Sequence, residues 1–112
     1  MKPTNIDCDI HSISAADLKN YELIDVRETD EINDWPLLKT CLLAGRPCRH
    51  VPFSKFPLNK DEFDKNKSYL LFCAKGGRSH FMATALTKEG YRAFSVNNGI
   101  ASLNAYLKEI NS

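Results

Sequence analysis

The order of apolar segments along the chain predicts an α/β fold, in which a central, mostly parallel β-sheet carries helices on both faces. Short runs rich in apolar and β-branched residues at 22–26, 68–73 and 93–96 are typical of buried strands. Segments with helical periodicity alternate with these runs, and Gly90 stands where one such helix is expected to end. Strands and helices that alternate in this way build parallel sheets covered on both sides.

The first elements are a short helix and a buried strand. The hydroxyl of Ser14 can cap a helix that ends near Asn20, and Glu22–Val26 then reads as a strand. The charged stretch Arg27–Glu31 is expected to begin a helical turn that Pro36 stops.

The middle of the chain is less regular. Gly45 and Pro47 interrupt the stretch Leu37–Cys48, which we expect to be irregular. His50–Pro52 is predicted to be a very short strand. Residues 53–63 alternate apolar anchors with charged side chains, which indicates one or two short surface helices with their apolar side toward the sheet.

The second half of the chain gives the clearest elements. Ser68–Cys73 is predicted to be a strand, and Ser79–Glu89 a helix that ends at Gly90. The apolar stripe of this helix is expected to contain Phe81, Met82, Ala85 and Leu86.

A further strand, a turn and a closing helix complete the predicted fold. The strand is Ala93–Val96, the turn is Asn97–Gly99, and the helix begins at about Ile100. Its apolar residues are spaced at i, i+4 and i+7, namely Leu103, Leu107 and Ile110.

Length and charge limit what the protein can be. A chain of 112 residues matches one domain, which we place at 1–112. Apolar residues make up 43% and charged residues 26%, and the net charge is only +1, so no strong field favours a nucleic acid or membrane partner. No stretch approaches the about 20 apolar residues of a membrane span.

The four cysteines indicate a reducing compartment. They lie at irregular spacing without a CxxC pair, and the N-terminus leads into no apolar signal-peptide segment. We therefore expect a cytoplasmic location.

The loop from Cys73 to Ser79 is the strongest functional signal. It follows a buried apolar run and leads into a helix, so the helix N-terminus presents unpaired N–H groups and positive dipole to the thiol. Gly76 and Gly77 are expected to let the backbone curl with positive φ. A cysteine in this setting, near Lys75 and Arg78, is expected to have a lowered pKa and to react as the thiolate.

Three stretches together resemble the rhodanese family of sulfurtransferases, and the likeness spans nearly the whole chain. Asp25–Arg27 matches the Asp-Val-Arg that ends a strand in that family, and Val51–Pro52 matches the end of its Asn-Ile-Pro segment. The Cys73 loop, with Arg78–Ser79, matches its catalytic loop.

Two segments depart from the family pattern. Leu43–Cys48 stands in place of Gly-His-Ile-Pro-Gly-Ala, within a region from Ile32 to Cys48 that is lengthened around Trp35–Pro36. The Gly-Gly turn is Asn98–Gly99, and the usual tryptophan of the last helix has no counterpart, so Leu103 and Tyr106 are expected to do that packing.

The resemblance implies a rhodanese-like three-layer fold and sulfur transfer without a cofactor. The Cys73 thiolate would attack the outer sulfur of a donor, either thiosulfate or a persulfide, and would keep that sulfur as a persulfide. A thiol, cyanide or a sulfur-acceptor protein would then remove it. Backbone N–H groups of the loop would hold the terminal sulfur as an oxyanion hole holds oxygen.

These arguments define the candidate site. Cys73 is the expected catalytic residue, and the expected substrate-binding residues are Ala74, Lys75, Gly76, Gly77, Arg78 and Ser79. We place Arg27 and Cys48 at the pocket edge, where Arg27 orders the neighbouring loop and Cys48 is a candidate resolving thiol. Lys75 either attracts anions or is an ordinary solvated charge.

A metal site is not expected. Cys41, Cys48 and His50 are too few and too unevenly spaced for a closed tetrahedral zinc site. His11 and His80 have no partner pattern, and we interpret His80 as a surface residue.

Other functions remain open from the sequence. A phosphatase or an arsenate reductase of the same fold is a weaker alternative, since tyrosine phosphatases place five residues between cysteine and arginine, whereas Cys73 and Arg78 enclose four. A regulatory rhodanese-like binding module is another, although such domains typically lack the cysteine. A persulfide relay shares the chemistry and differs only in its acceptor.

Overall fold

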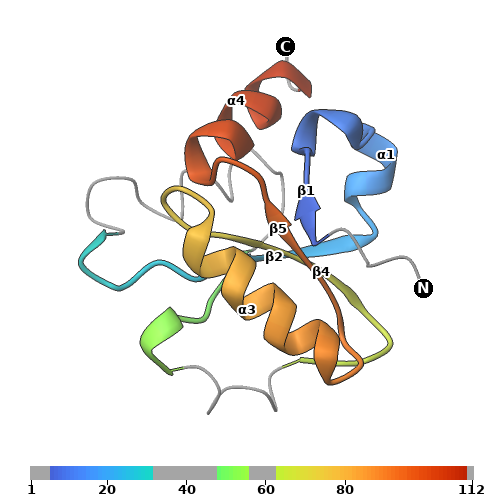
Figure 1. Ribbon diagram of the computed structural model, residues 1–112. Helices are drawn as coiled ribbons and strands as arrows, with labels where there is room; N and C mark the ends of the chain where they lie inside the picture. The colour runs from blue at the N-terminus through green and yellow to red at the C-terminus, as the bar shows by residue number, and fades with distance from the viewer. Residues whose placement is uncertain (1–5, 32–47, 56–62, 111–112) are drawn as a thin grey trace.

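Five strands form one parallel sheet in the computed structural model, which describes residues 6–31, 48–55 and 63–110 (Figure 1). The sheet order is β1-β5-β4-β2-β3. All pairings between the described strands are parallel. The strands are β1 (Asp7–Cys8), β2 (Tyr21–Asp25), β3 (Arg49–His50), β4 (Ser68–Phe72) and β5 (Arg92–Val96). This confirms the predicted α/β class and its sheet.

Helices cover both faces of the sheet, as Figure 1 shows. The element α3 (Gly77–Lys88) lies on one face, and α1 (Ala15–Leu18) and α4 (Ile100–Ile110) lie on the other. Two short 3-10 helices, η1 (Ile10–Ser12) and η3 (Phe53–Lys55), complete the described elements. Parallel strands need such crossover connections, so this layering follows from the order of elements.

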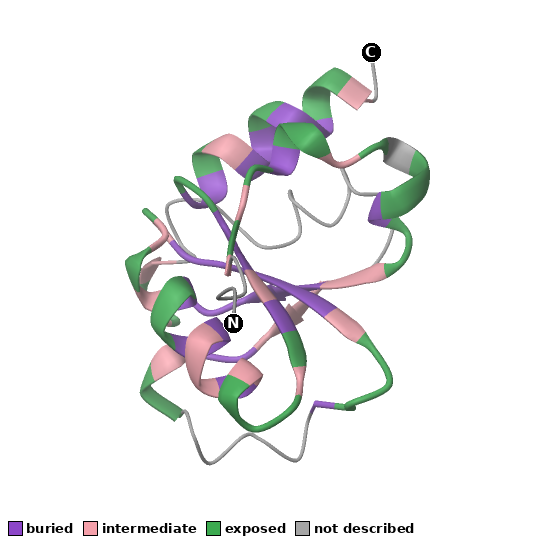
Figure 2. Cartoon of the chain, turned by 45° about the vertical axis from the view of Figure 1, so that its right-hand side comes forward, coloured by how far each residue is buried: buried purple, intermediate pink, exposed green. Residues whose placement is uncertain are grey.

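The two central strands send successive side chains into two separate cores. Ile24 and Leu71 pack under α3 with Met82 and Leu86. Leu23, Leu70 and Phe72, which adjoin Ile24 and Leu71 along the strands, face the other core. That core consists of Ile10, Leu18, Leu23, Leu70, Phe72, Val96, Ile100, Leu103, Tyr106 and Leu107. Figure 2 shows the buried strands between helices whose outer surfaces are exposed. A strand buried on both faces reads as a continuous apolar run, which is why β2 and β4 are visible in the sequence.

Local signals account for the helix ends. The Ser14 hydroxyl accepts a hydrogen bond from the backbone N–H of Asp17 at 3.0 Å, which confirms the predicted cap of α1. Gly90 has φ of +96° just after α3, as expected for a residue that ends a helix. Leu103 and Leu107 are fully buried, and Tyr106 donates a hydrogen bond to the Ile13 carbonyl at 2.5 Å, so α4 packs without a tryptophan.

Several predicted boundaries shift. The helix α3 begins at Gly77 rather than Ser79, because only Gly76 of the two loop glycines has positive φ, at +106°, and Gly77 is already helical. The strand β3 ends at His50, so Val51–Pro52 follows it. The strand β1 was not predicted, since two residues carry too little periodicity to identify a strand.

The apolar stripe predicted for α3 is wrong in two members, since Phe81 is exposed and Ala85 is only partly buried. Phe81 is 60% exposed, and the core positions of the helix are Ser79, Met82, Ala83 and Leu86. The ring of Phe81 instead makes an edge contact with Phe53 of η3, with centroids 5.7 Å apart. The expected irregular stretch Leu37–Cys48 and the lengthened segment around Trp35–Pro36 lie, apart from Cys48, outside the described residues.

Candidate functional site

The Cys73 loop lies at the carboxyl end of β4, between that strand and α3. In parallel sheets this edge is where ligands bind, because loops and helix N-termini converge there. Ala74, Lys75 and Gly76 form the bend, and α3 starts at the next residue. The predicted loop residues therefore lie together at this edge of the sheet.

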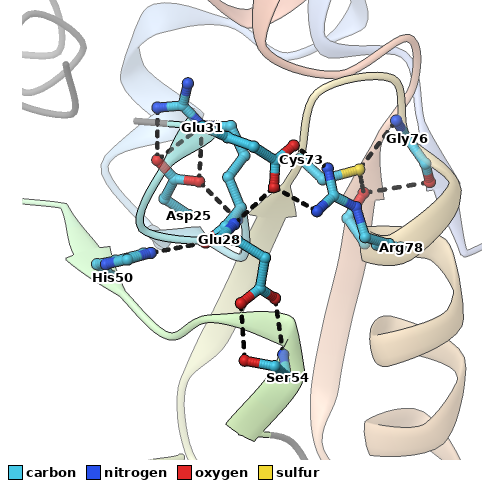
Figure 3. A network of polar contacts seen from close by, with 10 residues as sticks. Asp25, Glu28, Glu31, His50, Ser54, Cys73, Gly76 and Arg78 are labelled. Carbon is cyan, nitrogen blue, oxygen red and sulfur yellow. Dashed lines mark hydrogen bonds and ion pairs between the residues drawn. The ribbon is translucent and has the colours of Figure 1, made fainter. Parts of the chain in front are cut away.

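Polar groups of the loop surround the Cys73 sulfur (Figure 3). The backbone N–H of Gly76 donates to Cys73 Sγ at 3.0 Å. Cys73 Sγ lies 3.5 Å from Ser79 Oγ. The residue itself is only 1% exposed, so these groups replace the water that would otherwise solvate a thiolate.

A second serine extends this network. Ser79 Oγ lies 2.7 Å from Ser95 Oγ on β5, and both hydroxyls lie within 3.4 Å of the Gly76 carbonyl oxygen. A hydroxyl has one proton to donate. When Cys73 is ionised, Ser79 can turn its proton to the sulfur while Ser95 donates to Ser79, and both serines are buried.

The pKa of Cys73 is lowered. Burial by itself would raise it, but hydrogen bonds from the Ser79 side chain and from the backbone of Ser79, Gly76 and Lys75 outweigh that effect. In contrast, burial followed by the charge of Asp9 raises the pKa of Cys8. The local donors therefore make Cys73 more acidic than an ordinary thiol.

The turn after β5 contacts the backbone of the Cys73 loop. The backbone N–H of Ile100 donates to the Cys73 carbonyl at 2.8 Å. Gly99 has φ of +75°, and a Cβ there would come within 2.4 Å of the Ala74 carbonyl oxygen. Only glycine fits this close approach, which explains the Asn98–Gly99 turn recognised in the sequence.

Arg78 forms an ion pair that was not predicted. Its two terminal nitrogens donate to the two carboxylate oxygens of Glu31, which follows β2 (Figure 3). The arginine hydrogen bonds lower the pKa of Glu31 to about 2, and the same carboxylate raises the pKa of Arg78. Each side chain is 31% exposed. Arg78 is therefore fixed by a carboxylate instead of projecting into solvent.

A cavity of about 370 Å³ opens over this arrangement. Its described lining residues are Glu31, Cys73, Ala74, Lys75, Gly77 and Arg78. Two larger hollows, of about 590 and 630 Å³, lie at the opposite end of the sheet, where Tyr69, Ser68 and Arg92 contribute to their walls. The smaller cavity is the candidate active site, since the Cys73 thiol lines it.

Arg27 and Cys48 do not line this cavity among the described residues. The Arg27 side chain is 3% exposed and binds the carboxylate of Asp25, with Nη2 to Oδ2 at 2.8 Å. The His50 ring donates from Nε2 to the Arg27 carbonyl at 2.7 Å. Cys48 packs against the core cluster under α4, whereas Cys73 belongs to the cluster under α3. The pocket-edge role and the resolving-thiol role stay predictions.

Sequence reasoning missed Glu31, Glu28 and Ser95. The Glu28 carboxylate accepts hydrogen bonds from the backbone N–H and hydroxyl of Ser54, at 2.8 and 2.7 Å, and so ties η3 to this loop. The signal for Glu28 and Glu31 was the charge density after β2, which does not show that Glu31 meets a residue 47 positions away. We found no sequence signal for Ser95.

The described residues contain neither a cluster of metal-ligating side chains nor a helix that could span a membrane. Within 6–31, 48–55 and 63–110, no three histidine, cysteine or acidic side chains gather as a metal site would require. In the same ranges, none of the helices has the length and apolar character needed to cross a bilayer. Cys41, which the sequence placed among candidate zinc ligands, lies outside these ranges. His80 is exposed as expected, with Nδ1 2.8 Å from Asp7 Oδ1.

A known family and several known proteins are similar to this chain. The family model described as Rhodanese-like domain matches residues 13–106. A tRNA sulfurtransferase of Vibrio cholerae is 28% identical over 88 residues, which is 79% of this chain and 17% of that protein. A tRNA sulfurtransferase of Aeromonas hydrophila is 36% identical over 72 residues, which is 64% of this chain and 14% of that protein. The chain thus spans less than a fifth of either relative.

Solved structures share the fold. A rhodanese-like domain protein from Staphylococcus aureus superposes with a TM-score of 0.64 at 26% identity, over 81% of this chain and 88% of that one. The Bacillus anthracis protein CoADR-RHD gives a TM-score of 0.72 at 22% identity, over 94% of this chain and 17% of that one. The second likeness concerns the fold alone.

Proposed function

The chain belongs to the rhodanese-like domain family, and on that premise we propose that it is a sulfurtransferase that carries sulfane sulfur as a persulfide on Cys73. The single observation that carries the proposal is the acidic, hydrogen-bonded Cys73 sulfur at the base of a cavity. Thiolates are the reactive form of cysteine, and a lowered pKa increases the fraction present near neutral pH.

The loop also suits the persulfide. A persulfide adds one sulfur beyond Cys73 Sγ, and its terminal atom carries the negative charge after transfer. The Gly76 N–H already lies 3.0 Å from Sγ, and the start of α3 offers further N–H groups and the positive end of the helix dipole. These donors stabilise charge on the attached sulfur without added cations.

The proposed donor is thiosulfate or a persulfide, and the proposed acceptor is a thiol, cyanide or a sulfur-acceptor protein. A persulfide relay shares this chemistry and differs only in its acceptor. In such a relay, Cys73 passes its sulfur to another thiol instead of to a free small molecule. We propose a reducing, cytoplasmic location for either version.

Two other classes have less support. The loop that closes on Sγ has four residues between Cys73 and Arg78, and Arg78 is engaged by Glu31 instead of facing a phosphoryl group. That arrangement disfavours a phosphatase or an arsenate reductase. A binding module without activity would not need the acidic thiol.

Intact-mass measurement tests the proposal. The purified protein is treated with thiosulfate or an alkyl persulfide, and we expect the addition of one sulfur atom that a reductant removes. Cys73→Ser is expected to abolish this addition with an unchanged fold, because oxygen cannot form the persulfide. Cys48→Ser is the matched control and is expected to retain the addition. Sulfur on the Cys73→Ser protein would place the nucleophile elsewhere.

A further inference from the structure

The charges around the Cys73 cavity are balanced by the Glu31–Arg78 ion pair. Four ionisable groups line the described wall of the cavity, namely Glu31, Cys73, Lys75 and Arg78. With Cys73 as the thiolate, two carry negative charge and two carry positive charge. Without Glu31, the same cavity would have a net positive charge and an arginine fork open to anions.

Glu31 is held firmly in this position. Its carboxylate accepts from both terminal nitrogens of Arg78 and, through Oε2, from the backbone N–H of Glu28 at 2.7 Å. Glu28 is in turn bound to Ser54, so the backbone that carries Glu31 is anchored to η3. The carboxylate is therefore a fixed part of the cavity, and Arg78 has its planar donor edge occupied.

The balanced charge of the cavity affects the binding of charged and uncharged sulfur donors differently. Thiosulfate carries two negative charges, and it gains no net attraction from a balanced cavity that includes a carboxylate. A protonated alkyl persulfide has no charge at its reacting sulfur, so its approach depends little on the field. Lys75 is exposed and belongs to the loop, which leaves it as a cation for either donor.

We propose that Glu31 is a specificity-determining residue: by binding Arg78 inside the cavity, it selects alkyl persulfides over thiosulfate as the sulfur donor. This inference rests on the proposed sulfurtransferase function of Cys73. Glu31 acts through the field and through Arg78, and it takes no part in bond making.

The favoured step is a thiol–persulfide exchange. The Cys73 thiolate attacks the outer sulfur of R–S–S–H, the bond between the two donor sulfurs breaks, and R–S⁻ leaves with that electron pair. Cys73 becomes Cys–S–S–H, so the proton stays on the transferred sulfur or passes to solvent. One S–S bond forms as one breaks, and no external oxidant or reductant is required.

The test compares two donors in the first half-reaction. The rate of sulfur addition to Cys73 is measured by quenched intact mass with thiosulfate and with 2-hydroxyethyl persulfide, which has no charged group in its carbon chain and reacts as its protonated form, with the rate constant referred to that form. In Glu31→Gln, we expect the second-order rate constant for thiosulfate to rise roughly tenfold, since one nearby negative charge is removed and Arg78 is released. The constant for the persulfide is expected to change by less than about twofold.

Asp30→Asn is the matched control. It makes the same change of charge one residue away, at an exposed carboxylate that does not belong to the described lining of the cavity. It is expected to leave the ratio of the two rate constants near the wild-type value. An equal rise for thiosulfate in Asp30→Asn would mean that net charge alone, and not Glu31, sets the preference.

A measurement on the wild-type protein keeps the inference testable if Glu31→Gln does not fold. A balanced cavity predicts that the thiosulfate rate constant changes by less than about threefold between roughly 0.05 and 0.5 M salt. A steep fall with salt would show an uncompensated positive cavity and would overturn the inference. An unchanged donor ratio in a folded Glu31→Gln protein would also overturn it. If neither donor adds sulfur to wild-type Cys73, the sulfurtransferase function itself fails.

Discussion

Two arginine–carboxylate pairs fix the segment that follows β2, and they differ in burial and in the residues they join. Asp25 and Arg27 are two positions apart, and their side chains are 0% and 3% exposed. Glu31 and Arg78 are far apart in sequence, and each is 31% exposed. The same chemical pair thus stands once inside the protein and once in the wall of a cavity.

Because of this difference in burial, we assign the Asp25–Arg27 pair a structural role and the Glu31–Arg78 pair an electrostatic role. Asp25 accepts hydrogen bonds from the Arg27 backbone N–H and from two nitrogens of its guanidinium, so loss of Asp25 would take the bidentate carboxylate away from a buried guanidinium. The Glu31–Arg78 pair is partly solvated, and such pairs contribute little to stability. Its charges can act on a ligand because they line the cavity.

Asp25→Ala should have the largest effect on stability. We expect the free energy of unfolding to fall by about 3–5 kcal/mol, because Arg27 would remain buried without its carboxylate. Urea denaturation followed by circular dichroism measures this change. Asp30→Ala, at an exposed position of the same loop, is the control and should change stability by less than about 0.5 kcal/mol. A loss below about 1 kcal/mol for Asp25→Ala would mean that the buried pair is not structural.

Gly99→Ala tests how much the contact between the turn after β5 and the Cys73 loop contributes to stability, compared with the two ion pairs. The added Cβ would meet backbone atoms of Ala74 at 2.4 Å in a residue with positive φ. We expect a loss of about 2 kcal/mol or more in the free energy of unfolding.

Gly77→Ala is its matched control. A Cβ at Gly77 meets no atom within 4 Å, and the residue is helical. This variant should be as stable as wild type or up to about 1 kcal/mol more stable, because alanine is the better helix former. Equal losses in the two variants would contradict the role given to Gly99.

Ser79→Ala tests whether a neutral hydroxyl, as distinct from the nearby ion pair, lowers the pKa of Cys73. Removal of the side-chain hydrogen bond should raise that pKa, while the burial that opposes ionisation remains. The pH dependence of alkylation by iodoacetamide measures the pKa, and the reaction near neutral pH should slow. Thr84→Val removes a hydroxyl of the same helix that donates to the His80 carbonyl, away from the sulfur, and it should leave the profile unchanged. An unchanged profile in Ser79→Ala would assign the acidity to backbone donors.

We expect the smallest effect for the contribution of Glu31 to the free energy of unfolding, which should disappear at acidic pH. The pKa of Glu31 falls from its usual 4.5 to about 2 on folding, so its contribution to stability is present above 4.5 and is lost as the pH falls toward 2. Partial exposure and screening limit this contribution to less than about 1 kcal/mol. Urea midpoints of wild type and Glu31→Gln should differ at neutral pH and converge near pH 2. A difference that persists at that pH would contradict the assignment.

The local sequence determined the strands and helices of the core and the composition of the Cys73 loop. The apolar runs of β2, β4 and β5 are readable because a strand buried on both faces needs apolar residues at nearly every position. The Ser14 cap, the Gly90 helix end and the Asn98–Gly99 turn are readable because each depends on hydrogen bonds or φ angles within a few residues.

Only the tertiary structure decided which charged residues meet. Glu31 reaches Arg78, and Ser95 reaches Ser79, because the parallel sheet brings the carboxyl ends of β2, β4 and β5 to one edge. It also decided that Phe81 is exposed, since the direction of a helix face depends on what the helix packs against. Neither a charge nor an apolar side chain specifies its partner in sequence, because Coulombic attraction and apolar burial depend on distances that the folded backbone sets.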